Sequence, residues 1–163
     1  MSFNPDQKNN ATYEGETNDE GKPHGRGVMS FEDGTIYSGN WQDGEMYGYG
    51  IMKLAHGGTC AGEWEKDQPS GAGVIHYPGG ELLMGEWAGF NLEGNGIISF
   101  PDGKQYIGTC KNGAMHGCGI LLGPDGETVQ GWFKEGQMHG WCSVITAEGE
   151  TISGYWEEGK RKS

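Results

Sequence analysis

Hydrophobic and polar residues alternate along this chain in short stretches that recur every 23 residues. In one such stretch, Tyr37, Gly39 and Trp41 alternate with Ser38 and Asn40. Successive side chains of a β-strand point to opposite faces, so this period of two predicts a strand. A second alternating stretch, residues 48–54, follows in the same unit. The pattern therefore predicts two strands per unit, and nothing along the chain has the periodicity of a helix.

Three columns of glycines keep the 23-residue spacing without a break, and such a fixed period is the signature of a repeat array. An aromatic or sulfur-containing residue stands two positions after each glycine of the first column. The three columns are Gly39, Gly62, Gly85, Gly108, Gly131, Gly154; Gly25, Gly48, Gly71, Gly94, Gly117, Gly140; and Gly34, Gly57, Gly80, Gly103, Gly126, Gly149.

Short turn motifs connect the predicted strands. Glu-Asp-Gly occupies residues 32–34 and Pro-Asp-Gly occupies residues 101–103 and 124–126, which is tight-hairpin chemistry. In the loop that joins the two strands of one unit, we expect Gly44 to have a positive φ. The predicted fold is an all-β, elongated, single-layer antiparallel meander of about thirteen strands. We expect Tyr and Trp rings to pack over bare backbone at Gly48 and Gly50.

The repeat resembles the MORN repeat, whose pattern is close to Y-x-G-x-W-x-x-G-x-x-H-G-x-G followed by a turn with D-G. The resemblance covers Tyr13 to about Gly159, in six full units and a shortened seventh, or about six and a half 23-residue β-hairpin repeats. The first unit has one extra residue, which we place in a loop between Thr17 and Gly21. Accordingly, we divide the chain into a disordered tail (1–11), the repeat array (12–159) and a basic tail (160–163).

The resemblance implies a non-catalytic module that binds other proteins. The family is also linked to phosphoinositide membranes, and similar arrays precede catalytic domains, so membrane recruitment and membership of a larger enzyme stay open as alternatives. The early units also resemble the MORN protein of ciliary radial spokes, and a myosin-adaptor MORN protein is another precedent. These likenesses imply a cytoskeletal or ciliary assembly.

The formal net charge of −12 argues against a nucleic-acid partner and disfavours an anionic lipid surface, because both require a surplus of Lys and Arg. The exception is the cluster Lys160, Arg161 and Lys162. The first residues lack an apolar leader, and the cysteines occupy repeat columns with no paired spacing. We therefore expect a cytoplasmic protein with free thiols.

The residues that could carry chemistry do not form a recognisable catalytic set, so we predict no enzyme activity and no cofactor. His24, His116 and His139 share one repeat column and are predicted to close loops by hydrogen bonds. The last two are about 10 Å apart by strand spacing, too far to share a zinc ion. Cys110 with His116 is the weaker metal alternative, and we predict no metal site.

Aromatic side chains are the predicted partner anchors, since Trp and Tyr dominate binding energy at protein interfaces. The glycine face is aromatic in the early units, whereas the opposite face turns apolar in the late units. Either the last hairpin or tail covers the late face, or a basic or amphipathic partner segment does; open terminal strands also allow a homodimer. The predicted partner-binding residues are Tyr37, Trp41, Trp64, Trp87, Tyr106, Trp132, Trp141, Tyr155 and Trp156.

Overall fold

The structure is a computed structural model that describes residues 8 and 10–162. Its fourteen strands follow one another in chain order, each hydrogen-bonded to the next. The predicted all-β antiparallel meander is therefore confirmed. The strands are β1 (Thr12–Thr17), β2 (Pro23–Ser30), β3 (Ile36–Gln42), β4 (Glu45–Lys53), β5 (Thr59–Glu65), β6 (Gln68–His76), β7 (Leu82–Ala88), β8 (Asn91–Ser99), β9 (Gln105–Lys111), β10 (Ala114–Leu122), β11 (Thr128–Lys134), β12 (Gln137–Ile145), β13 (Thr151–Glu157) and β14 (Lys160–Arg161).

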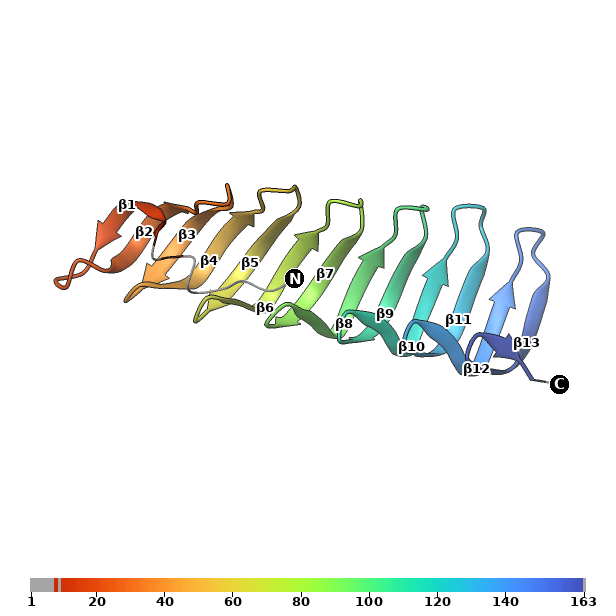
Figure 1. The fold of residues 1–163 in the computed structure, drawn as a ribbon. Helices are drawn as coiled ribbons and strands as arrows, with labels where there is room; N and C mark the ends of the chain where they lie inside the picture. The colour runs from red at the N-terminus through yellow and green to blue at the C-terminus, as the bar shows by residue number, and fades with distance from the viewer. Residues whose placement is uncertain (1–7, 9, 163) are drawn as a thin grey trace. The chain divides into compact units, whose positions relative to one another are not determined.

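The chain divides into two compact units, which are described separately. Unit 1 comprises Met1–Pro78 and Trp87–Phe90, and unit 2 comprises Gly79–Glu86 and Asn91–Ser163. Strands β1 to β6 belong to unit 1, and β8 to β14 belong to unit 2 with most of β7. Within each unit, consecutive strands lie side by side as hairpins (Figure 1).

The core of unit 1 depends on tyrosines that lie over glycines. The hydroxyl of Tyr37 donates a hydrogen bond to the carbonyl of Asn40 at 3.2 Å, and Tyr13 makes the same bond to Glu16 at 2.7 Å. A Cβ built on Gly50 would lie 2.1 Å from the Tyr37 hydroxyl oxygen, a distance that real Cβ atoms do not reach. Glycine at this position is therefore required for packing, as predicted.

Tryptophans complete this layer. The indole nitrogens of Trp41 and Trp64 donate to the carbonyls of Gly27 and Gly50, each at 3.2 Å. The Tyr37 ring meets both indoles in edge-to-face geometry, with centroids 5.1 and 5.2 Å apart. Such pairs add about 0.5–1.5 kcal/mol each beyond their buried area. The buried face of unit 1 thus contains an aromatic layer in which Tyr37, Trp41 and Trp64 bond to backbone carbonyls, whereas the buried indole nitrogen of Trp87 has no hydrogen-bond partner.

Unit 2 repeats this construction around Tyr106. Its hydroxyl donates to the carbonyl of Thr109 at 2.8 Å, and its ring would lie 2.3 Å from a Cβ on Gly119. Phe133 packs edge-on against the tyrosine at 5.2 Å. Aliphatic and sulfur-containing side chains fill the remainder of the buried face, namely Leu83, Leu92, Ile98, Cys110, Met115, Val129, Cys142 and Val144.

The glycine column that contains Gly48 has a different role from the one we predicted. Gly48 has a φ of +65°, in the left-handed region, and a Cβ there would approach the Asn40 side chain rather than a ring. Gly71 has a φ of +68° and lies beside the Glu63 carboxylate. These glycines are required for backbone conformation, because an L-residue in this region costs roughly 1–2 kcal/mol. Gly50 acts through packing instead, as does Gly39, whose Cβ would lie 2.6 Å from the Tyr37 hydroxyl oxygen.

The turns between the paired strands form a backbone ladder. Asp43 and Gly44 both have positive φ values, as a type I′ turn requires, which confirms the prediction for Gly44. In unit 1, the amide of Gly44 donates to the carbonyl of Pro23 at 2.8 Å. Four further bonds join residues with the same separation of 21 positions: Asp67 to Met46, Gly113 to Leu92, Gly136 to Met115 and Gly159 to Met138. Each of these five turns is thus held by the preceding repeat.

The predicted boundaries need one correction. Lys160 and Arg161 form β14 and pair with Glu157 and Trp156, so the array extends past residue 159 and these residues are not a free tail. Strand β14 is also the strand that the pattern missed. Most of the predicted N-terminal tail, residues 1–7 and 9, lies outside the described residues, although Lys8 is described and contacts unit 1.

Candidate partner-binding surface

Five of the nine predicted partner-binding residues lie in the core. Their exposed fractions are 5% or less, so little of each ring is available to a partner in this structure. Trp156 is half-buried. Of the nine, only Trp132, Trp141 and Tyr155 are exposed, at 54%, 69% and 45%. The five core residues are Tyr37, Trp41, Trp64, Trp87 and Tyr106.

The exposed aromatics lie on the solvent-facing side of unit 2. Trp141 on β12 pairs across the ladder with Tyr155 on β13, and their rings meet edge-on at 6.2 Å. Trp132 on β11 pairs with Cys118 on β10, and its Cβ lies 3.3 Å from the Cβ position of Gly140, the residue before Trp141. The three rings therefore come from three consecutive strands of one face.

Exposed aliphatic side chains lie on the same face. Ile107 and Ile120 are direct cross-strand partners on β9 and β10, and Ile145 lies near the end of β12. Their exposed fractions are between 37% and 46%. We name the following six residues the exposed face of unit 2: Ile107, Ile120, Trp132, Trp141, Ile145 and Tyr155.

The repeat position of Trp132 is polar in unit 1. Asn40 and Glu63 occupy the position of Trp132 in their repeats, and Arg26 pairs with Asn40 across β2 and β3. Tyr49 occupies the position of Trp141 and is 68% exposed, but its hydroxyl bonds to the Glu63 carboxylate at 3.3 Å. A shallow hollow lined by Arg26, Asn40 and Tyr49 lies on this surface. Unit 1 thus has polar side chains at the position of Trp132, whereas Val28 and Ile51, at the position of Ile120, are 37% and 48% exposed.

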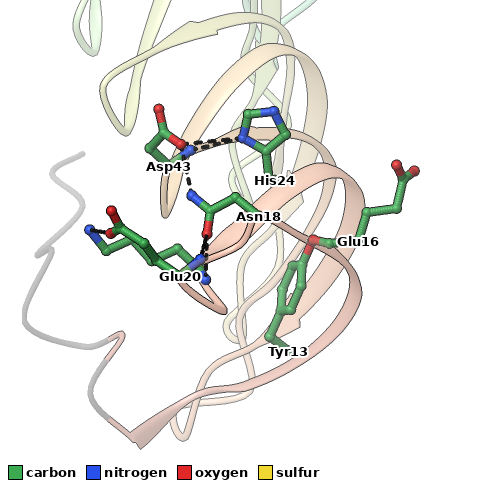
Figure 2. Close-up of polar contacts among 7 residues, drawn as sticks. Tyr13, Glu16, Asn18, Glu20, His24 and Asp43 are labelled. Atoms are coloured by element: carbon green, nitrogen blue, oxygen red, sulfur yellow. Dashed lines mark hydrogen bonds and ion pairs between the residues drawn. The ribbon is translucent and has the colours of Figure 1, made fainter.

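The first repeat absorbs its extra residue in a loop, as predicted. Figure 2 shows the Asn18 side chain in this loop: its oxygen accepts the amides of Glu20 and Lys22, each at 3.0 Å, and its nitrogen donates to Asp43 at 2.9 Å. The Asp43 amide donates to Nδ1 of His24 at 3.4 Å. This histidine therefore helps to close its loop, which confirms the prediction for His24. Asn18 is half-buried and the other side chains are exposed, and the cluster fixes the chain path.

Several core groups resist ionisation. Burial, with a smaller contribution from Cys110, raises the pKa of Tyr106 to about 12. Burial raises the pKa of Cys60 to about 12, and burial together with Glu93 raises that of Cys110 to about 11. Burial also raises the pKa of Tyr37. The tyrosine hydroxyls thus stay protonated and act as donors at neutral pH.

At the C-terminal end, two of the three residues in the basic cluster 160–162 bond to other groups of this chain. Arg161 donates to the carbonyl of Ser153 at 2.8 Å, and Lys162 pairs with Glu157 at 2.7 Å.

Across residues 8 and 10–162, no three His, Cys, Asp or Glu side chains form a group that could hold a metal ion. In the same residues there is no helix with the length and apolar character needed to span a membrane.

Family models for the MORN repeat match residues 19–36, 37–59, 60–81, 84–105 and 106–128, which together make up more than half of the chain. The chain belongs to the MORN-repeat family. The resemblance predicted from the Tyr, Gly and Trp columns is confirmed. Residues 129–161 lie beyond the matched repeats, yet β11 to β14 continue the same antiparallel pairing, with Phe133 buried at a tryptophan position.

Solved structures to which the chain is similar include two TCP-type domains. The TCP10 domain of Danio rerio CPAP in complex with a peptide of Danio rerio STIL is 14% identical, with a TM-score of 0.36 over 88% of this MORN chain and 70% of that chain. The SAS-4 (dCPAP) TCP domain of Drosophila melanogaster in complex with a proline-rich motif of Ana2 (dSTIL) is 10% identical, with a TM-score of 0.36 over 86% and 88%. No curated protein sequence matches the chain. Likeness of this degree assigns no partner to the MORN array.

Proposed function

We propose that this MORN-repeat protein is a non-catalytic, protein-binding scaffold and that its partner docks on the exposed face of unit 2. The observation that carries the proposal is the gathering of Trp132, Trp141 and Tyr155 on three consecutive strands, each ring at least 45% exposed. Large exposed apolar patches on a soluble protein mark interaction sites. Tryptophan and tyrosine are the residues most enriched among interface hot spots.

The partner segment is expected to be basic and amphipathic. Its apolar side would pack on the rings, and its positive charges would be favoured by a protein with a formal net charge of −12. A second copy of the chain is the other occupant with the right chemistry, because it would bring the same apolar face. The predicted cytoskeletal or ciliary location is supported by the family resemblance alone, and the predicted cytoplasmic location by the first residues and the cysteine pattern. Both are tested by imaging the tagged protein in its native cell.

The test uses a photo-crosslinking residue, p-benzoylphenylalanine, placed at position 141 or at position 49 in the full chain expressed in its native cell. These positions are equivalent in their repeats, and both native side chains are more than two-thirds exposed. We expect a partner crosslinked from position 141 and not from position 49. Equal crosslinking from both positions would contradict the proposal.

Substitution then measures the energy of the contact. With the purified partner, Trp132→Ala combined with Trp141→Ala is expected to weaken binding at least about tenfold, the effect of removing one or more hot spots. Tyr49→Ala is the matched control and should leave binding unchanged. Melting temperatures of both variants should stay close to that of the parent, because the side chains are exposed. If light scattering shows a dimer that the double variant converts to monomer, the occupant is a second copy.

A further inference from the structure

Unit 1 contains a largely buried site that is occupied by a charged side chain. The ammonium of Lys8 pairs with the carboxylate of Asp67, and it donates to the carbonyl of Gly44 at 2.9 Å. It also lies 5.4 Å from the centroid of the Trp41 ring. Lys8 precedes β1 and reaches groups that are 36 and 59 residues further along the chain.

Both members of the ion pair are largely removed from water. The side chain of Lys8 is 18% exposed and that of Asp67 is 10% exposed. The amide of Met46 donates a second hydrogen bond to the same carboxylate oxygen at 2.8 Å. A buried carboxylate without a cation would be strongly destabilising, so a positive charge is required at this position.

The carboxylate is not needed for the turn in which it lies. Gly44, Gly113, Gly136 and Gly159 stand at this turn position in other repeats and make the same backbone ladder bond as Asp67. Asp67 has a φ of +66°, in the left-handed region, which aspartate adopts more readily than most residues but less readily than glycine. The turn therefore contains an aspartate where glycine would suit the backbone better. What Asp67 has and glycine lacks is a carboxylate.

The three groups around the Lys8 nitrogen match the properties of a primary ammonium. An ammonium carries three donors and no acceptor, and it binds carboxylates, carbonyls and the faces of indole rings. We propose that Asp67, the Gly44 carbonyl and the Trp41 ring form a lysine-binding site, which Lys8 fills in the free protein. A lysine of a basic partner segment occupies it when Lys8 is displaced. This site is independent of the exposed face of unit 2.

The experiment supplies the lysine from a separate molecule. The full chain with Lys8→Ala is titrated with a peptide of residues 3–12 of this sequence, and with the same peptide acetylated on the lysine nitrogen. Binding is followed by NMR at the backbone amides of Gly44 and Met46. We expect the unmodified peptide to shift both amides of the Lys8→Ala chain and to bind at least tenfold more tightly than the acetylated peptide.

Three further chains separate a ligand site from a merely structural contact. The parent chain should bind the peptide at least tenfold more weakly than Lys8→Ala, because its own lysine competes. Lys8→Ala combined with Asp67→Gly keeps the turn and should lose binding. Lys22→Ala, which removes an exposed lysine paired with Glu20, should behave as the parent. Equal binding of the two peptides, or no peptide binding to Lys8→Ala, would overturn the proposal.

Discussion

The two units share a buried face but differ on the face that meets water. In unit 1, Tyr37 lies over Gly50, and in unit 2, Tyr106 lies over Gly119 with nearly identical geometry. The solvent side diverges, since Asn40 in unit 1 corresponds to Trp132 in unit 2. The repeat pattern therefore constrains one face for folding, and the other face is free to vary for binding.

Substitutions on the shared buried face should lower the free energy of unfolding the most. Gly50→Ala in unit 1 and Gly119→Ala in unit 2 each place a methyl group less than 2.5 Å from a buried tyrosine. Overpacking of this kind costs about 1–3 kcal/mol, and these contacts are at the severe end. We expect both variants to lose about 3 kcal/mol in thermal or denaturant unfolding. Gly79→Ala, with open space around its Cβ, is the control. A large loss from only one of the two variants would show that the cores are not equivalent.

Substitution of a glycine whose φ lies in the left-handed region should have the next largest effect on stability. Gly71→Val should destabilise the protein by roughly 2 kcal/mol, because a β-branched residue is strained at a φ of +68° and its Cβ would meet the Glu63 carboxylate at 2.8 Å. Ser70→Val changes the neighbouring residue without that conformational demand and should cost much less. Comparison of the two melting temperatures tests whether Gly71 is required for its backbone conformation. Equal shifts in the two variants would contradict that requirement.

Alkaline pH should weaken both units in the same way. The pKa of Tyr106 is raised to about 12 and that of Cys60 to about 12, above the values for unfolded chains. A group whose folded pKa is raised binds its proton more tightly in the folded state. Its stabilising contribution is complete below the unfolded pKa and is lost as pH rises toward the folded value. Stability measured by urea unfolding should therefore fall from about pH 9 to pH 12. A flat profile would mean that these protons are not linked to folding.

Thiol accessibility gives the smallest effect and requires no mutation. Cys118 is exposed on β10 beside Trp132, whereas Cys60, Cys110 and Cys142 are buried. In the native protein a small alkylating reagent should modify Cys118 first, with little change in stability, and mass spectrometry of the digest identifies the site. Protection of Cys118 by a bound partner would link this readout to the exposed face of unit 2.

The strand pattern and the glycine spacing were sufficient to predict the fold, because a 23-residue period and alternating faces leave few arrangements. They also predicted which late residues, such as Trp132 and Trp141, face away from the glycine rows. They did not show that Tyr37 and Trp41 are sealed in the core. That burial comes from packing between strands, such as the Tyr37 ring against the Trp41 and Trp64 rings, and alternation does not reveal these contacts.

The Lys8 site was missed for a different reason. Its groups come from positions up to 59 residues apart, and the turns bring them together. The sequence holds one signal, which is Asp67 at a turn position where Gly44 and three later glycines stand. A charged residue that interrupts a glycine column is thus informative about binding, in addition to the aromatic columns on which the prediction relied.

The ladder of amide bonds between turns bears on how such a protein changes length during evolution. Each bond joins residues 21 positions apart, as from Gly136 to Met115, within a period of 23. Duplicating or deleting one whole period preserves every such separation on either side of the new junction. An insertion of any other size must be accommodated in a loop, as the extra residue of the first repeat is near Asn18. Gene segments of this family can therefore expand in steps of one hairpin without disturbing the copies already present.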